Sequence, residues 1–180
     1  MPKIVDRELY NGSGAKIKRL ELDPLVSEIE GVLTGFNLSL REEKDANGGK
    51  EVRLRVDERF ATKGGWIQGR RSKPDVDWIK CLMINGRRIC VGVEVQFSAR
   101  SEMTVVDIIH LRRDIVAGKL DLGIILTSSE RMAPFLTNRG PSFSVCKKII
   151  SELHAEEQPL ILYAVEHDSP GPALPKQKKR

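Results

Sequence analysis

Residues 74–97, PDVDWIKCLMINGRRICVGVEVQF, carry the signals that decide the fold. The Asn85-Gly86 pair predicts a two-residue turn between antiparallel strands, because both central residues of a type I′ turn need positive φ. Side chains alternate along the second strand, so Glu94 and Gln96 share one face and the other face is apolar, with Val91, Val93, Val95 and Phe97. Two polar side chains in an otherwise buried strand need an explanation.

The turn also fixes which residues lie opposite each other. With Asn85-Gly86 as the turn, Asp77 lies opposite Glu94 and Asp75 lies opposite Gln96, all on one face. Opposed residues have Cβ atoms roughly 4.5–5.5 Å apart, and two carboxylates at that distance repel unless one is protonated or a cation lies between them. Carboxylate oxygens suit Mg²⁺, which leaves its other positions to water and phosphate oxygens. The hairpin therefore predicts a Mg²⁺ site for phosphodiester chemistry; the alternative is a pair of solvated strand carboxylates.

Length and composition set the frame around this hairpin. A chain of 180 residues that is 40% hydrophobic is long enough for one domain with a real core, and we expect it to span residues 1–166. Residues 167–180, HDSPGPALPKQKKR, have the composition of a flexible basic tail. The formal net charge of +5 suits an anionic partner without requiring one.

Several functional classes are not favoured by the sequence. The three cysteines have unrelated spacings, which indicates neither a disulfide framework nor a zinc site. The segment NGSGAK, residues 11–16, lacks the full P-loop pattern and predicts a turn. No signal peptide and no apolar run of roughly 20 residues is present, so we expect a cytoplasmic protein with no membrane partner.

Outside the hairpin, hydrophobic periodicity predicts alternating helices and strands. The segment 52–66 is compatible with either a strand or a short helix. The remaining elements are clearer: helices at 23–36, at 101–119 with Ser101 as candidate cap and Gly118 as stop, and at 142–156, and strands at 120–127 and 159–166. This alternation predicts an α/β fold in which helices pack on a sheet.

The acidic hairpin resembles the active-site motif of the PD-(D/E)xK nuclease superfamily, which usually has Lys where this chain has Gln96. The Gln variant is similar to type II restriction endonucleases of the BglII-like group, on the strength of DWIK at 77–80 followed by VEVQF at 93–97. The resemblance extends more loosely to RFATKGGW (59–66) and LDLGIILTSSERM (120–132), within about residues 20–165. It implies a restriction-endonuclease-like core, a mixed central β-sheet flanked by helices.

The resemblance also implies roles for individual residues. Asp77 and Glu94 would bind Mg²⁺, with the backbone carbonyl of Val95 as a further ligand. Gln96 would orient the attacking water by hydrogen bonds, since an amide cannot polarise it as a lysine does. The implied reaction is in-line hydrolysis of double-stranded DNA, leaving 5′-phosphate and 3′-hydroxyl ends.

Further residues are candidates for supporting roles. Asp75 rivals Asp77 as first ligand because it has the same facing, although the register and the DWIK match favour Asp77, and Glu58 is a candidate accessory carboxylate. Basic and amide side chains near the motif and after the strand at 120–127 are candidates for DNA contact: Lys63, Arg70, Arg71, Lys73, Arg131, Asn138 and Arg139. Because the chain carries one catalytic hairpin, cutting both strands implies a homodimer acting on a palindromic site.

Two alternatives stay open. A DNA-repair or transposon-end nuclease of the same fold would keep the carboxylates without needing base specificity. A non-catalytic DNA-binding module would bind duplex DNA and never cut it, and Gln96 in place of lysine is the feature that favours this reading.

Overall fold

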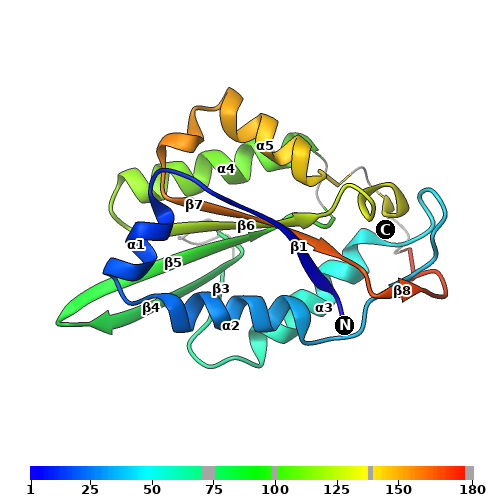
Figure 1. Ribbon diagram of the computed structural model, residues 1–180, viewed down its shortest axis with the longest axis horizontal. Coiled ribbons are helices and arrows are strands. Elements are labelled where there is room, and N and C mark those ends of the chain that lie inside the picture. The colour runs from blue at the N-terminus through cyan, green and yellow to red at the C-terminus, as the bar shows by residue number, and fades with distance from the viewer. Residues whose placement is uncertain (70–75, 99–100, 138–139, 177–180) are drawn as a thin grey trace.

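The computed structural model describes residues 1–69, 76–98, 101–137 and 140–176 (Figure 1). Its central sheet has the strand order β1-β7-β6-β5-β4-β3. These strands are β1 (Lys3–Leu9), β3 (Ile67–Gln68), β4 (Trp78–Ile84), β5 (Arg87–Val95), β6 (Leu122–Ser128) and β7 (Leu160–Glu166). The α-helices of the described residues are α1 (Ser13–Arg19), α2 (Asp23–Thr34), α3 (Gly49–Ala61), α4 (Ser101–Val116) and α5 (Phe143–Glu152). The predicted α/β class with a mixed sheet is confirmed.

The sheet is mixed because its connections differ in length. Strands β5, β6 and β7 are parallel and are joined through α4 and α5, whereas β4 pairs antiparallel with β5 across a tight turn. Strand β1 pairs antiparallel with β7 and is the outermost strand on that side. Because β5, β6 and β7 are parallel to one another, their carboxyl ends lie along the same edge of the sheet.

Helices cover both faces of the sheet, with α4 and α5 on one side and α2 and α3 on the other (Figure 1). The α2–α3 side buries the apolar face of β5, which carries Val91, Val93 and Val95, together with Phe97 just beyond the end of the strand. Phe60 of α3 stacks on Trp78 of β4 with 5.4 Å between ring centroids. The predicted two-faced character of β5 is confirmed, and its polar face is turned to the α4 side.

The β4–β5 hairpin has the register predicted from its turn. Asn85 and Gly86 have φ of 50° and 75°, and pairing runs from Ile84↔Arg87 to Trp78↔Val93. The same register places Cys81 opposite Cys90, and the two form a disulfide. The expectation of no disulfide was therefore wrong, because it rested on cysteine spacing and ignored cross-strand pairing. The third cysteine, Cys146, is buried, and burial raises the pKa of its thiol to about 12.

Two segments are more ordered than their sequences indicate. NGSGAK begins with a turn at Asn11 and Gly12, which have φ of 41° and 65°, but α1 starts directly afterwards at Ser13. The ambiguous segment at 52–66 lies largely in α3, where Val52, Val56 and Phe60 are buried at helical spacing.

The C-terminal residues differ from the expected flexible tail as far as residue 176. Ser169–Pro170 forms strand β8, which pairs with β2 (Ser39–Leu40), and the backbone N–H of Leu174 donates to Asn47 Oδ1 at 3.1 Å. His167 is buried between carboxylates of Glu42 and Glu166. These partners lie far away in the sequence or in the preceding strand, so the segment's composition gave no sign of them. Residues 177–180 lie outside the described part.

No helix in the described ranges is long and apolar enough to cross a membrane.

Candidate active site

The candidate site lies where β5 ends, at the edge shared by the carboxyl ends of the parallel strands. Asp77 directly precedes β4, and its Oδ2 accepts a hydrogen bond from the backbone N–H of Val95 at 2.8 Å. This contact holds the Asp77 carboxylate across the hairpin, close enough to Glu94 for the two charges to interact. The structure therefore brings Asp77 and Glu94 together, as the register predicts.

Glu94 is a buried carboxylic acid, with 2% of its surface exposed. Its Oε1 has no hydrogen-bond partner among the described residues. Burial, and then the negative charges of Asp77 and Asp107, hold the pKa of Glu94 well above its ordinary value. A buried carboxyl group with an unused oxygen beside two other acids is an environment that a cation would stabilise.

Gln96 is 1% exposed, and α4 fixes both ends of its amide. Its Nε2 donates to Asp107 Oδ2 at 2.7 Å, and its Oε1 accepts from the Thr104 hydroxyl at 3.0 Å. Within the described part of the chain, the second N–H of the amide has no acceptor assigned to it and can serve another group. Burial also raises the pKa of the Asp107 carboxyl. Sequence reasoning identified Gln96 but missed Thr104 and Asp107, because only the packing of α4 on β5 brings them together.

Arg53 of α3 also belongs to the site, although the sequence analysis did not select it. Its Nη2 forms an ion pair with Asp77 Oδ1, and its Nη1 donates to the backbone carbonyl of Val95 at 3.4 Å. Its Nε donates to Asp57 Oδ2 at 3.3 Å. Gly49 lets the start of α3 pack close to the end of the hairpin, because a Cβ there would collide with the backbone oxygen of Phe97. The guanidinium thus contacts two of the three groups expected to bind metal.

On α3, Asp57 lies beside Asp77, whereas its neighbour Glu58, the candidate accessory carboxylate, points away from the site. Asp57 Oδ1 accepts a hydrogen bond from Trp78 Nε1 at 2.8 Å, which ties α3 to β4 beside Asp77. Burial raises the pKa of Asp57. Glu58 is exposed, and no interaction in the described residues joins it to Asp77 or Glu94. One step along a helix turns a side chain by about 100°, which separates these two neighbours.

The structure places only some of the expected DNA-contacting residues. Arg131 follows β6 at the same edge of the sheet as the site; it is exposed and pairs with Glu42. Lys63 lies just after α3 and is half-buried. The others lie outside the described residues, as does the rival ligand Asp75: Arg70, Arg71, Lys73, Asn138 and Arg139.

The donor set can be compared with the needs of a metal ion. Within the described ranges, no group of three or more His, Cys, Asp or Glu side chains is placed to hold a metal. The expected set is smaller, since it consists of two carboxylates and the Val95 carbonyl. The unpartnered oxygen of Glu94 fits a divalent cation. Arg53 occupies Asp77 and the Val95 carbonyl, so a metal would have to take its place.

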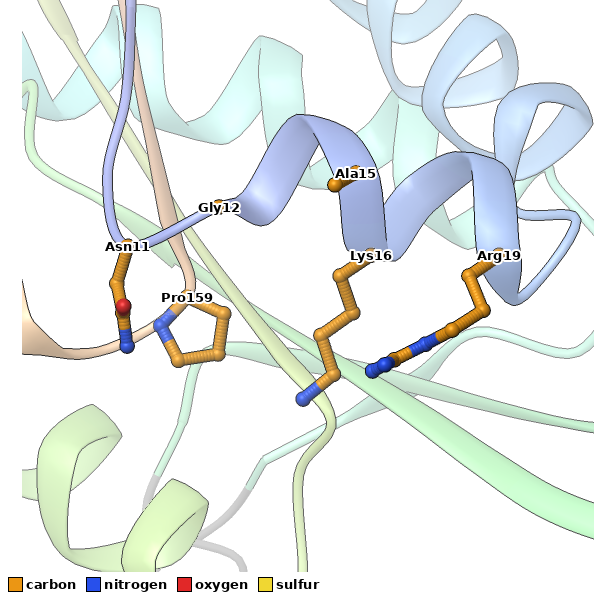
Figure 2. Close-up of a pocket in the computed structure, with 6 residues that line it drawn as sticks. All are labelled: Asn11, Gly12, Ala15, Lys16, Arg19 and Pro159. Carbon is orange, nitrogen blue, oxygen red and sulfur yellow. The ribbon is translucent and has the colours of Figure 1, made fainter.

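A separate cavity of about 370 Å³ lies at the opposite edge of the sheet (Figure 2). Lys16 and Arg19 of α1 extend toward it, and Pro159, which precedes β7, forms part of its wall. Burial lowers the pKa of Lys16. The amino ends of the parallel strands lie on this side, so the cavity is distinct from the carboxylate site.

Comparison with known proteins gives one family. The family model described as "Restriction endonuclease BglII/BglIII" matches residues 8–162 of the 180-residue chain. No curated protein matches the chain. The matched range contains the whole hairpin, α3 and α4, and therefore every residue of the carboxylate site described above.

Proposed function

Because the chain belongs to the BglII/BglIII restriction endonuclease family and is thus a DNA-cleaving restriction enzyme, we propose that it is a type II enzyme acting on double-stranded DNA with Mg²⁺. The observation that carries this proposal is the pairing of Asp77 with the buried Glu94 at the end of the hairpin. In a nuclease, two acids held this close can bind a metal ion, whereas in a domain that only binds DNA their repulsion lowers stability.

Asp77, Glu94 and the Val95 carbonyl would hold the metal. The chemistry supplied by bound Mg²⁺ is Lewis-acid stabilisation of the charge that develops on the phosphate. The hydrogen bond from Val95 N–H keeps one oxygen of Asp77 in place, and the other, which Arg53 holds here, would face the cation once the guanidinium moves away. Burial of Glu94 keeps competing water away from its carboxylate.

Gln96 would position a reacting group by hydrogen bonding. Its carbonyl oxygen is already used by Thr104, and Asp107 takes one of its N–H groups. The second N–H can donate to the attacking water or to a phosphate oxygen, and it cannot remove a proton. The proposed reaction is therefore in-line hydrolysis by water, with 5′-phosphate and 3′-hydroxyl ends as products.

We propose that two copies act together on a palindromic site. One chain supplies one catalytic hairpin, while a double-strand break needs two. Four apolar side chains are exposed along α4, the helix that follows the site: Met103, Val106, Ile109 and Val116. Packing of a second copy against this side of α4 would cover them and hold two sites in a fixed relation. Access to cellular DNA makes the cytoplasm the proposed place of action.

The experiment that tests the function is digestion of phage DNA by the purified protein with Mg²⁺, followed by sequencing of the ends. The proposal predicts discrete fragments whose ends share one short palindrome. Random ends would indicate a nuclease without base specificity. Binding without any cut would indicate a non-catalytic DNA-binding protein. The ion pair between Arg53 and Asp77 is the observation that supports this alternative.

A further inference from the structure

The planar guanidinium of Arg53 contacts three different acceptors among the described residues. Its two terminal nitrogens reach Asp77 Oδ1 and the Val95 carbonyl oxygen, and its Nε reaches Asp57 Oδ2 at 3.3 Å. The side chain is 26% exposed and Asp77 is 20% exposed, so water screens the ion pair only in part. A fork-shaped cation is thereby held where the proposed function needs a divalent one.

The surroundings explain why a cation is needed at this position. The negative charge of Asp77 raises the pKa of Asp57, Glu94 and Asp107, so these carboxylates lie close enough to repel. Arg53 neutralises part of this charge in the protein without metal. A guanidinium does not lose its proton in this pH range, so only displacement can free the oxygens that it holds.

Resting on the proposed function, we propose that Arg53 is a resident counter-ion that competes with the divalent cation for Asp77 and the Val95 carbonyl. The enzyme without DNA therefore binds metal weakly, because a metal ion must first break these contacts. Asp57 provides the displaced guanidinium with a second carboxylate on the same helix, at i,i+4 spacing, so Arg53 can leave Asp77 without losing all its partners.

The inference is tested by calorimetric titration of the DNA-free, full-length protein with Ca²⁺. Arg53→Met keeps a helix-forming side chain of similar length and removes the fork. It is expected to bind Ca²⁺ at least about tenfold more tightly than the wild type, the factor that corresponds to losing one charge-assisted contact. Arg53→Lys keeps the charge but not the fork, and a gain of at least about threefold is expected because a lysine makes fewer simultaneous contacts.

The matched control is Arg55→Met on the same helix. Arg55 has a comparable pair with Glu51, at 3.5 Å, and a contact with the Asn37 carbonyl, but none of these groups belongs to the site. Its Ca²⁺ affinity is expected to stay within about twofold of the wild type, because a partly exposed charge away from the site is screened. Adding Glu94→Gln to Arg53→Met should abolish the gain, which would assign it to the carboxylate site.

Either of two results would overturn the inference: equal or weaker Ca²⁺ binding by Arg53→Met, or a gain that survives Glu94→Gln. If Arg53→Met does not fold, Arg53→Lys decides, and wild-type affinity in that variant would also overturn it. The proposed function fails separately, if the wild type with Mg²⁺ leaves DNA intact, because the titration contains no DNA.

Discussion

Replacing Glu94 by glutamine is expected to make the protein more stable while abolishing cleavage. Glu94 is buried with one oxygen unpartnered among the described residues, and it lies beside Asp77 and Asp107. A glutamine of nearly the same shape removes the negative charge and supplies an N–H that can donate to Asp77. The variant therefore relieves a cost that bound metal, or protonation of Glu94, would relieve in the wild type.

The size of the effect follows from the cost of an unsatisfied buried polar group. Leaving such a group unpaired costs about 1–3 kcal/mol, and more if it is charged. For a chain of this length, 1 kcal/mol corresponds to about 2–4 °C in the midpoint of thermal unfolding. Glu94→Gln is therefore expected to raise the midpoint by about 2–12 °C in EDTA at pH 8.

The pH dependence has a definite sign. The pKa of Glu94 is raised in the folded protein, so the native state binds more protons than the unfolded chain between the ordinary glutamate pKa and the raised one. Wild-type stability falls as pH rises through this window. Since the glutamine does not titrate, its advantage should be largest at pH 8 and should shrink as pH falls toward the ordinary glutamate range.

The assay is thermal unfolding of both proteins from pH 8 down to pH 5, with cleavage measured separately. Glu152→Gln serves as control, because Glu152 is exposed and its pair with Lys148 is 3.6 Å long. The control should change the midpoint by less than about 2 °C, as expected for an exposed ion pair. A Glu94→Gln protein that is no more stable than the wild type at pH 8, or whose advantage grows on acidification, would refute the reasoning.

Three further predictions concern mechanism, recognition and assembly. Gln96→Ala should slow single-turnover cleavage by more than about tenfold with little change in DNA affinity, because the hydrogen bond from Gln96 acts chiefly in the transition state. Asp107→Asn should slow cleavage less, because it only loosens the Gln96 amide. Equal rates for the wild type and both variants would remove Gln96 from the mechanism. Arg139→Ala should lose roughly 1–3 kcal/mol of binding and relax preference at one position across single-base variants of the site, whereas uniform weakening would make Arg139 a phosphate contact. Ile109→Glu should convert a dimer into a monomer in light scattering, and a monomeric wild type, with and without DNA, would contradict the proposed assembly.

The sequence predicted the hairpin well because its signals are local. A turn of Asn85-Gly86 fixes the register, and the register fixes which side chains face each other. The same register implied the Cys81–Cys90 disulfide, which was missed because cysteine spacing was judged along the chain instead of across the strands. Long periodic helices such as α2 and α4 were predicted for a similar reason, since their patterns repeat over several turns.

The residues around the carboxylates were harder to predict because they depend on α3. Val52, Leu54 and Val56 alternate as in a strand, although burial in the structure follows helical spacing and leaves Leu54 partly exposed. Because the sequence did not decide between helix and strand for this segment, it could not predict that Arg53 and Asp57 lie on the side facing the site. The edge strand β1 was missed as well, because its sequence KIVDREL is mostly exposed and polar.

The most direct test of the central claim compares cleavage and DNA binding in Asp77→Asn and Glu94→Ala. With Mg²⁺, both variants should make no detectable cut in DNA that the wild type and Glu152→Gln cut to completion. With Ca²⁺, which fills carboxylate sites without supporting hydrolysis, specific binding of uncut DNA should persist in the wild type. Asp77→Asn and Glu94→Ala should keep that binding within about tenfold, because phosphate contacts dominate affinity. Wild-type cleavage rates in Asp77→Asn or in Glu94→Ala would contradict the assignment of this carboxylate pair as the catalytic site.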